Sequence, residues 1–257
     1  MSPHILEMEL HGKRALVTGA SRGIGAATVR ALAAAGVDVV AGYRNRIADA
    51  EAVVAAARVA GVRAIACAAD VAHPGDAQRL VETAVTELGG LDIFVGNAGI
   101  WPPDDVPFRE MKEEQWRQTI RQNIDSIFLT TQAAIRALSD GGRIVLVSST
   151  SGQRGEAGHA DYAASKGAAI SFAKSLAVEL GPRQITVNCV APGWVDTQMV
   201  EDAIAKTGVD RVIESIPLGR IASADDIALP ILFLCSRFAR HITGEVLNVN
   251  GGSVLCG

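Results

Sequence analysis

Two side chains of the run YAASK, Tyr162 and Lys166, lie four residues apart and could together move a proton. On a helix this spacing places both side chains on one face, one turn apart. Because an ammonium group stabilises a nearby phenolate, we expect Lys166 to lower the pKa of Tyr162 from its usual value of about 10. Such a tyrosine can donate a proton to a carbonyl oxygen or accept one from an alcohol. Alone the pair is weak evidence, since tyrosine and lysine at this spacing usually form a solvated helix face.

A glycine-rich segment, TGASRGIG at residues 18–25, lies where a short apolar run meets a helical pattern. Gly19 allows the chain to turn tightly. Gly23 and Gly25 let the backbone and the helix approach a pyrophosphate at the helix N-terminus. Glycines at such spacings also arise by chance, but the strand–turn–helix context predicts a dinucleotide site.

The residues after the second apolar run indicate which dinucleotide binds. Folds that select NAD place an acidic residue there to bind the adenosine ribose, whereas this chain has Tyr43 followed by Arg44. We expect Arg22 and Arg44 to hold a 2′-phosphate from two sides. The alternative is that Arg44 and Arg46 are solvated loop residues. The sequence therefore favours NADP(H) over NAD(H).

Strand-like and helix-like segments alternate along the whole chain. Uniformly apolar runs between helices are typical of a parallel sheet covered on both faces. We therefore predict one α/β domain over residues 1–257, a doubly wound Rossmann-type fold with a seven-stranded parallel sheet. The predicted strands are 14–18, 37–42, 62–69, 91–95, 143–149, 185–190 and 246–249, and the predicted helices are 24–35, 47–60, 74–88, 113–138, 161–180 and 223–237.

Two of these segments carry more specific expectations. Ser223 and Asp226 match a capping box that opens the last helix. Residues 191–222 are less regular, and 196–216 have the mixed pattern of a mobile flap. In the helix 113–138 we expect the following side chains to point inward: Trp116, Ile120, Ile124, Ile127 and Phe128.

Composition excludes several classes of partner. The net charge is −4 and no run of lysine or arginine stands out, so nucleic acid and anionic membranes are not expected to bind. The longest apolar stretch, 227–235, is too short to cross a bilayer, and the first ten residues do not resemble a signal peptide. Four scattered cysteines form no metal-ligand or disulfide pattern. We expect a soluble cytoplasmic enzyme without a metal ion.

Taken together, six motifs resemble the short-chain dehydrogenase/reductase family over nearly the whole chain. The closest likeness is to the bacterial 3-oxoacyl-carrier-protein reductase branch. The motifs are TGASRGIG, GNAG at 96–99, Asn123 within QNIDSIF, Ser149 ending VLVSS, YAASK, and APGWVDT at 191–197.

The resemblance implies a catalytic role for four residues. Tyr162 would be the acid in reduction and the base in oxidation. Lys166 would lower the pKa of Tyr162 and bind the nicotinamide ribose. Ser149 would hydrogen-bond the substrate oxygen, and Asn123 would hold a water that links the lysine to solvent. Asn123 could instead be a polar residue that kinks a helix.

The resemblance also implies which residues hold the cofactor. Residues 70–71 would contact adenine, 97–99 the adenosine ribose, and 192–197 the nicotinamide. The full expected set is Gly19, Ser21, Arg22, Gly23, Ile24, Gly25, Tyr43, Arg44, Asp70, Val71, Asn97, Ala98, Gly99, Tyr162, Lys166, Pro192, Gly193, Val195 and Thr197.

The chain departs from the family pattern at two places. Gly96 replaces the first asparagine of the usual NNAG, which affects a hydrogen bond within the sheet. Asp140 stands about where carrier-protein reductases have a basic residue, although Arg183 remains available. An acidic carrier protein would meet a less favourable surface, so we discount a carrier-bound substrate, although the sequence leaves open whether a carrier delivers it.

These observations predict an NADPH-dependent carbonyl reductase that also works in reverse as an alcohol dehydrogenase on a small-molecule substrate. The first alternative is an NAD-dependent sugar or secondary-alcohol dehydrogenase. A non-catalytic, dinucleotide-sensing regulator is a remote alternative, because such a protein would usually have lost a serine, tyrosine or lysine of the site.

The sequence says less about the substrate and the assembly. Loops 101–108, 153–159 and 194–208 should form the pocket. Trp101, His159 and Trp194 could contact a ligand, but both tryptophans could be packing residues and His159 a solvated one. The resemblance further implies a homotetramer built from helices 113–138 and 161–180 and the C-terminal strand. The apolar residues on more than one face of those helices agree with this.

Overall fold

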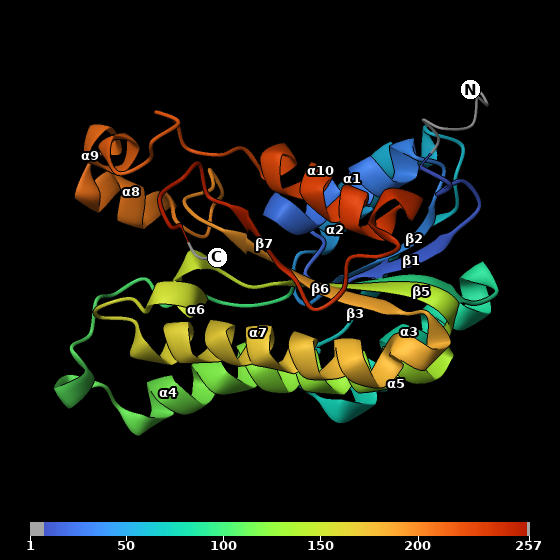
Figure 1. The fold of residues 1–257 in the computed structure, drawn as a ribbon, viewed down its shortest axis with the longest axis horizontal. Coiled ribbons are helices and arrows are strands. Elements are labelled where there is room, and N and C mark those ends of the chain that lie inside the picture. Colours follow the sequence, from blue (N-terminus) through green and yellow to red (C-terminus); the bar gives the residue numbers. More distant parts are fainter. Residues whose placement is uncertain (1–7, 256–257) are drawn as a thin grey trace.

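The computed structural model describes residues 8–255, which form one parallel sheet in the order β3-β2-β1-β4-β5-β6-β7 (Figure 1). The strands lie close to the predicted ranges, so the predicted fold class is confirmed. The largest difference is in the fifth strand, which begins five residues before the predicted start at 143. The strands are β1 (Arg14–Val17), β2 (Asp38–Tyr43), β3 (Ala64–Ala68), β4 (Leu91–Gly96), β5 (Leu138–Val147), β6 (Thr186–Pro192) and β7 (Val246–Val249).

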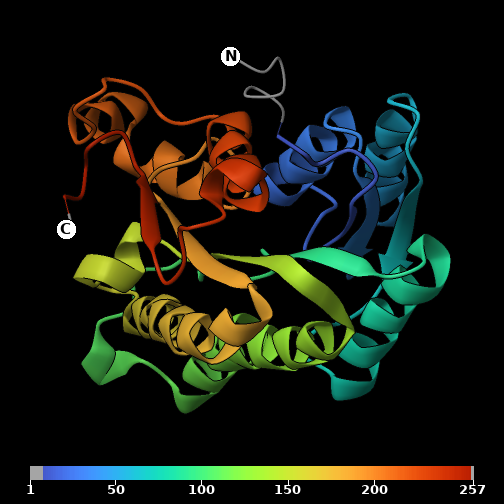
Figure 2. The ribbon, with the colours of Figure 1, turned by 45° about the vertical axis from the view of Figure 1, so that its right-hand side comes forward.

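Helices cover both faces of the sheet, because each crossover between parallel strands carries a helix to one side (Figure 2). One face packs a core that includes Leu32, Val54 and Ile227, and the other a core that includes Leu80 and Phe94. The first face is covered by α1 (Gly23–Ala34), α2 (Ile47–Arg58) and α10 (Ala224–Cys235), and the second by α3 (Pro74–Leu88), α4 (Glu113–Ile120), α5 (Ser126–Ala137) and α7 (Ala160–Leu180).

The strand order creates the place where a ligand can bind. β1 pairs with β2 on one side and with β4 on the other, so the connections that leave these strands diverge at their carboxyl ends. A crevice opens at such a switch point in doubly wound sheets. The short helices α6 (Thr150–Arg154), α8 (Glu201–Thr207) and α9 (Val209–Glu214) lie at this carboxyl end (Figure 1).

The long helix predicted for 113–138 is interrupted in its middle. A π-helical turn, η3 (Arg121–Asp125), separates α4 from α5. Ile127 is buried as predicted, but Trp116 and Phe128 are 36% and 48% exposed, so the inward prediction is wrong for these two. The remaining two, Ile120 and Ile124, are half-buried. Extra residues in a π turn rotate the following helix, which changes which side chains face the core.

The segment predicted to be irregular contains both α8 and α9. The capping box of α10 is confirmed: Ser223 Oγ accepts from the Asp226 N–H at 3.2 Å, and Asp226 Oδ2 accepts from the Ser223 N–H at 2.8 Å. Three 3₁₀ turns complete the described elements: η2 (Phe108–Glu110), η4 (Gly181–Arg183) and η5 (Arg237–Ala239).

Two remaining expectations concern membranes and cysteines. Within residues 8–255, none of the helices is long and apolar enough to cross a bilayer. Cys67, Cys189 and Cys235 are free and buried, and Cys256 lies outside the described residues. Across the same range, His, Cys, Asp and Glu side chains form no group of three or more that could hold a metal ion.

Candidate active site

The loop after β1 lines the first pocket with backbone rather than with side chains. Gly19 and Gly23 have φ angles of 64° and 54°, in the left-handed region that favours glycine. A Cβ on Gly25 would overlap the carbonyl oxygen of Gly19, and a Cβ on Gly19 would lie 2.9 Å from the Cα of Ala98. Among the described residues no side chain caps α1, so its first N–H groups remain available to an anion. This cradle fits a pyrophosphate.

Asn97 ties the end of β4 to the glycine loop. Its Nδ2 donates to the carbonyl oxygens of Thr18 and Gly19 at 3.0 and 3.1 Å. Thr18 Oγ1 in turn accepts from the N–H groups of Asn97 and Ala98, each at 3.0 Å. The preceding Gly96 is closely packed, because a Cβ there would lie 2.7 Å from Leu146 Cδ2. A larger residue at this position of the family motif would need the Leu146 side chain to move.

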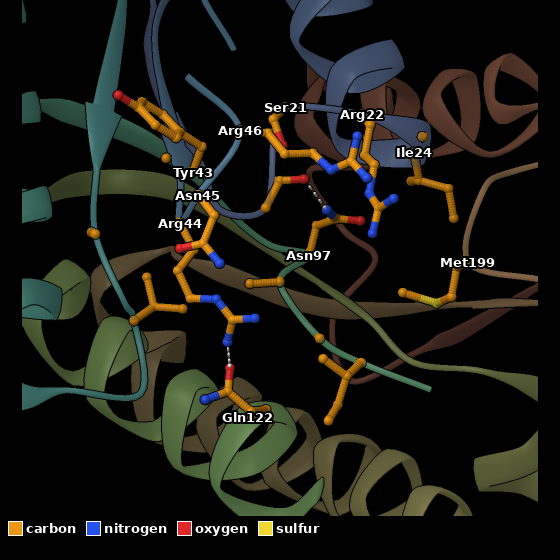
Figure 3. Close-up of a pocket in the computed structure, with 18 of the residues that line it drawn as sticks. Ser21, Arg22, Ile24, Tyr43, Arg44, Asn45, Arg46, Asn97, Gln122 and Met199 are labelled. Carbon is orange, nitrogen blue, oxygen red and sulfur yellow. Dashed lines mark hydrogen bonds between the residues drawn. The ribbon is translucent and has the colours of Figure 1, made fainter. Parts of the chain in front are cut away.

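The pocket above this loop brings together most of the predicted cofactor residues (Figure 3). Eight residues outside the predicted cofactor set also line it: Gly42, Asn45, Arg46, Ala69, Ile100, Gln122, Gln198 and Met199. Six predicted residues lie outside this lining: Gly25, Tyr162, Lys166, Pro192, Gly193 and Val195. The predicted residues found in it are Gly19, Ser21, Arg22, Gly23, Ile24, Tyr43, Arg44, Asp70, Val71, Asn97, Ala98, Gly99 and Thr197.

The basic residues of the pocket are arranged differently from the expected clamp. The Arg44 guanidinium turns to the far side and donates to Gln122 Oε1 at 2.7 Å (Figure 3). Arg46 instead extends toward Arg22, whose own guanidinium donates to Gln198 Oε1 at 2.7 Å. Burial lowers the pKa of Arg22, and the neighbouring Arg46 cation lowers it further. Two cations that repel each other across a pocket form a place where an anion would bind.

The nicotinamide end of the predicted set follows β6. Thr197 faces the glycine loop, since a Cβ on Gly23 would lie 3.3 Å from Thr197 Cγ2. Val195 is buried and pairs with Ala222 in an isolated bridge. Gly193 packs against Asn250 and lines a second pocket. The residues after β6 therefore do not all line one pocket, and Val195 instead holds the segment against the rest of the fold.

The second pocket is lined by two of the four catalytic candidates, Ser149 and Tyr162, and Lys166 lies one helical turn beyond Tyr162. Ser149 follows β5 and caps α6, and Tyr162 and Lys166 lie in the first two turns of α7. All three are nearly buried, at 8%, 9% and 4% exposure. Tyr162 and Ser149 share a side-chain hydrogen bond. Lys166 Nζ donates to the carbonyl oxygen of Val147 at 2.8 Å and lies 5.7 Å from the centre of the Tyr162 ring.

The predicted downward shift of the tyrosine pKa is wrong for this structure. Burial disfavours the phenolate and raises the pKa of Tyr162 to about 12, although the hydrogen bond to Ser149 acts in the other direction. Burial also lowers the pKa of Lys166 to about 8. The physical reason is that both groups have left water, which disfavours the phenolate and the ammonium ion alike.

Asn123 lies in the π turn η3 and braces the site from below. Its Oδ1 accepts from the Ile100 N–H at 2.7 Å, and its Nδ2 donates to the Ile100 carbonyl at 2.9 Å and to Ser165 Oγ at 3.0 Å. A Cβ on Gly99 would lie 3.1 Å from Asn123 Oδ1 and 3.4 Å from Lys166 Nζ. Asn123 and Lys166 therefore face one spot beside the cofactor pocket. The predicted water link stays a prediction.

Comparisons with known proteins agree with this geometry. Residues 19–253 match a family model described as enoyl-(acyl carrier protein) reductase. The 3-oxoacyl-(acyl-carrier-protein) reductase of Escherichia coli K12 is 40% identical over 247 residues, covering 95% of this chain and 98% of its own. An uncharacterized oxidoreductase of Methylorubrum extorquens is 43% identical over 246 residues, covering 95% and 98%. A short chain dehydrogenase from Burkholderia cenocepacia, solved in complex with NADP, superimposes with a TM-score of 0.89 at 40% identity, covering 95% and 98%.

The chain belongs to the short-chain dehydrogenase/reductase family. It is most similar to the 3-oxoacyl-carrier-protein reductase branch and is an NAD(P)-dependent oxidoreductase.

In this short-chain dehydrogenase/reductase, His159 holds the loop that covers the catalytic pocket. The imidazole is 1% exposed, so it is not the solvated residue considered above. It stacks on Trp101 with ring centres 4.5 Å apart, and its Nε2 lies 2.9 Å from the carbonyl oxygen of Pro102. Val106 N–H donates to the Gly158 carbonyl at 2.9 Å. Trp101 and Trp194 line the pocket, so both are placed where they could contact a ligand, as expected from the sequence.

Arg154 and Glu156 line this pocket from the predicted loop 153–159, although the sequence analysis did not single them out. The lining residues that it missed are Thr150, Ser151, Ser215 and Ser253. Glu156 Oε2 accepts from Ser151 Oγ at 2.7 Å, and Glu156 Oε1 lies 3.8 Å from His159 Nδ1. Arg154 is exposed at the same pocket. Both residues lie between Ser149 and the YAASK run in the sequence, and this proximity to two catalytic residues could have indicated that they line the pocket.

Proposed function

We propose that this protein reduces a ketone to a secondary alcohol with NADPH, reversibly. The observation that carries the proposal is the pair of guanidinium groups, Arg22 and Arg46, in the cofactor pocket. No acidic residue follows β2 before Asp49, and the Asp49 carboxylate is paired with Arg46 at 3.1 Å, so no unpaired acid there would repel a 2′-phosphate. The Burkholderia neighbour, solved with NADP, supports the same choice.

The residues present fit this cofactor. The glycine loop and the N-terminus of α1 would hold the pyrophosphate, and Arg22 and Arg46 the 2′-phosphate. Asp70 and Val71 line the pocket where adenine would lie. The two pockets share Met199, so a cofactor bound in the first would reach the second, where the substrate binds. NADPH, when bound, supplies a hydride.

The catalytic residues are suited to protonate the substrate oxygen. With a pKa raised to about 12, Tyr162 keeps its proton at neutral pH and can donate it to the oxygen of a ketone as that oxygen gains charge. Ser149, hydrogen-bonded to Tyr162, lies beside the same oxygen. Lys166 would bind the nicotinamide ribose. In the reverse direction Tyr162 would accept the proton of an alcohol.

A 3-oxoacyl ester or thioester is the first substrate class to test. The curated relatives named as 3-oxoacyl reductases support it. The predicted obstacle to a carrier protein, Asp140, forms an ion pair with Arg183 at 2.8 Å, so neither group offers an unpaired charge. Arg154 makes no ion pair among residues 8–255 and would meet a phosphate or carboxylate at the pocket.

We also propose that the protein forms a homotetramer. Trp116 on α4, Phe128 on α5 and Val178 on α7 are exposed on one layer of helices, and β7 is an edge strand. Exposed apolar residues on neighbouring helices favour contact with a second copy. Light scattering of wild type and of Phe128→Glu tests this. A monomeric mass for wild type at working concentrations would contradict it.

One panel of assays tests the activity. Ketones, β-ketoesters and sugars are each offered with NADPH and with NADH. We expect the largest kcat/KM for a β-ketoester with NADPH, at least about tenfold above NADH, because a charge-assisted bond contributes about 1.5–3 kcal/mol. Equal use of both cofactors would refute the phosphate assignment. Oxidation of sugars with NAD alone would favour the alternative dehydrogenase.

A further inference from the structure

One segment of the chain covers the catalytic pocket and is also tied to the cofactor pocket. Residues 198–216, here called the flap, contain α8 and α9 and lie at the carboxyl end of the sheet (Figure 1). Met199 lines both pockets, and Val200 lines the catalytic pocket. The flap lies wholly within the described range, and its only buried residues are Ala203, Val212 and Ile216. A segment with so little packing depends for its position on the contacts of its other side chains.

Two polar contacts join side chains of the flap to other parts of the chain. Gln198 Oε1 accepts a hydrogen bond from Arg22 Nη1 at 2.7 Å, across 176 positions of sequence. Lys206 Nζ lies 3.4 Å from Asp104 Oδ1. The first contact ends at the glycine loop of the cofactor pocket, whereas the second ends at the loop 101–108. The two contacts therefore hold the same segment, and one of them reaches the place where the cofactor would bind.

The guanidinium of Arg22 can keep its bond to Gln198 and bind a phosphate at the same time. A guanidinium carries several N–H donors in a planar fork, and Gln198 uses one of them. The other N–H groups of the Arg22 side chain donate to no residue within 8–255. Arg46 extends toward the same guanidinium (Figure 3). A 2′-phosphate between the two cations would thus leave Nη1 of Arg22 with Gln198.

We propose that Gln198 is a positioning residue that makes closure of the flap depend on the 2′-phosphate of the cofactor. An arginine side chain loses rotamer freedom when its guanidinium is fixed in one place. A bound phosphate fixes Arg22 in advance, so Gln198 then forms its bond with a smaller loss of entropy. NADPH therefore holds the flap over the catalytic pocket more firmly than NADH does, and the substrate binds more tightly.

The inference rests on the proposed function in one respect, because it takes Arg22 as a ligand of the 2′-phosphate. It goes further, since it links this phosphate to the substrate pocket through Gln198 and its neighbours Met199 and Val200. The link depends on one hydrogen bond in a partly exposed place. We therefore expect effects of about three- to fivefold.

Two nucleotides without a nicotinamide ring isolate the effect of the phosphate. Adenosine 2′,5′-bisphosphate and 5′-AMP differ only in the 2′-phosphate, and neither can hold the flap through a nicotinamide. Hydrogen exchange of the amides in residues 198–207 is measured by mass spectrometry with each nucleotide at saturation. For wild type we expect exchange to be about three- to fivefold slower with the bisphosphate. In Gln198→Ala the two nucleotides should give equal rates.

Lys206→Ala is the matched control, because it removes the other contact of the same segment. Any change in exchange should be the same with both nucleotides, so the ratio of the two rates should stay at its wild-type value. A residue that merely stabilised the flap would behave in this way. The ratio therefore separates the proposed role of Gln198 from a general loss of stability.

The same dependence should appear in substrate binding. Ethyl acetoacetate is titrated by calorimetry onto the enzyme saturated with NADP⁺ or with NAD⁺, neither of which can reduce a ketone. In wild type we expect its Kd to be about threefold lower with NADP⁺. In Gln198→Ala the Kd should be equal with both cofactors. Turnover of the ketone is measured separately and tests the proposed activity, whereas the exchange ratio needs no substrate.

Each outcome supports or overturns the inference. A ratio that is lost in Gln198→Ala and kept in Lys206→Ala supports it. Equal exchange with both nucleotides in wild type overturns it, and so does a ratio that survives in Gln198→Ala. Faster exchange with the bisphosphate also overturns it, because the phosphate would then draw Arg22 away from Gln198. Equal affinity of wild type for the two nucleotides would refute the phosphate assignment and the inference together.

Discussion

The cofactor pocket and the catalytic pocket of this protein are built from different materials. The first is shaped by backbone at Gly19, Gly23 and Gly25, and its arginines reach in from exposed positions. The second contains buried catalytic side chains, Ser149 and Tyr162 at 8% and 9% exposure, and Lys166 is buried beside it at 4%. Function therefore depends on shape in one pocket and on protonation in the other.

This difference decides which forces matter in each place. Charges in the cofactor pocket remain near solvent, where each contributes a modest, salt-dependent amount. In the catalytic pocket burial outweighs neighbouring charges, so the pKa of Tyr162 rises while that of Lys166 falls. A ligand can bind in the cofactor pocket without changing the charges of its side chains. A ligand in the catalytic pocket must change the pKa of the buried groups there.

The largest expected effect is the loss of activity when the hydroxyl oxygen of Tyr162 is removed from the catalytic pocket. Tyr162→Phe removes the proton donor and should lower kcat/KM for ketone reduction by about 10³-fold, within the range for a lost general acid. Its Kd for NADPH should stay within about threefold of wild type, since a net hydrogen bond is worth about 1 kcal/mol or less here. Activity close to wild type would show that another group donates the proton.

Tyr43→Phe removes a phenolic hydroxyl group from the cofactor pocket, as Tyr162→Phe does from the catalytic pocket. Tyr43 ends β2 and lines that pocket. We expect this variant to change NADPH affinity slightly and to leave kcat unaltered. If Tyr43→Phe reduced kcat as much as Tyr162→Phe does, the assignment of cofactor binding to one pocket and proton transfer to the other would be wrong.

The same division explains what the sequence could and could not predict. The glycine loop was predictable because left-handed backbone and close approach are local requirements that only glycine meets. The pKa of Tyr162 was not, since burial depends on segments far apart in the chain. The exposure of Phe128 follows from a π turn for which the sequence carries no signal, and the directions of the Arg44 and Arg46 side chains depend on how the loop after β2 turns.

The next largest effect tests which arginine binds the 2′-phosphate. Arg46→Ala should lower the preference for NADPH over NADH by about tenfold or more, because it removes a charge-assisted bond. Arg44→Ala should lower it less, since the Arg44 guanidinium is bonded to Gln122. The measurement is kcat/KM with each cofactor. A larger loss in Arg44→Ala would restore the clamp expected from the sequence.

Arg30→Ala is the matched control for these variants. Arg30 lies on α1 outside the cofactor pocket, 3.9 Å from Asp225. Its removal changes the net charge equally and should leave the preference as it is. A similar drop in Arg30→Ala would assign the effect to overall charge.

A smaller effect concerns the stability of the catalytic pocket. Burial lowers the pKa of Lys166 from 10.5 to about 8, so folding is opposed by the buried charge at neutral pH. Between pH 8 and 10.5 the unfolded chain binds more protons at this residue, and stability should rise with pH. Lys166→Met removes the penalty. At pH 7 we expect its free energy of unfolding to exceed that of wild type by about 1–3 kcal/mol, while turnover is lost.

Denaturant melts from pH 7 to 11 check the sign of this effect. The advantage of Lys166→Met should shrink as pH rises above 8 and vanish only above 10.5, where lysine becomes neutral in the unfolded state as well. The pKa of Tyr162, raised to about 12, affects both proteins alike above pH 10 and cancels in the difference. Lys174→Met, exposed on the same helix, should show no such trend. A less stable Lys166→Met at pH 7 would contradict the burial argument.

The smallest effect lies at the loop over the catalytic pocket. His159→Phe keeps an aromatic ring against Trp101 but loses the hydrogen bond to Pro102, so the loop that carries Trp101 should be held less firmly. We expect KM for the ketone to rise about three- to fivefold, the equivalent of one neutral hydrogen bond, with NADPH affinity unchanged. His241→Phe, at an exposed position, controls for the substitution itself. A change in NADPH affinity as large as the change in KM would mean that His159 supports both pockets, and the contrast between them would be less complete than the structure indicates.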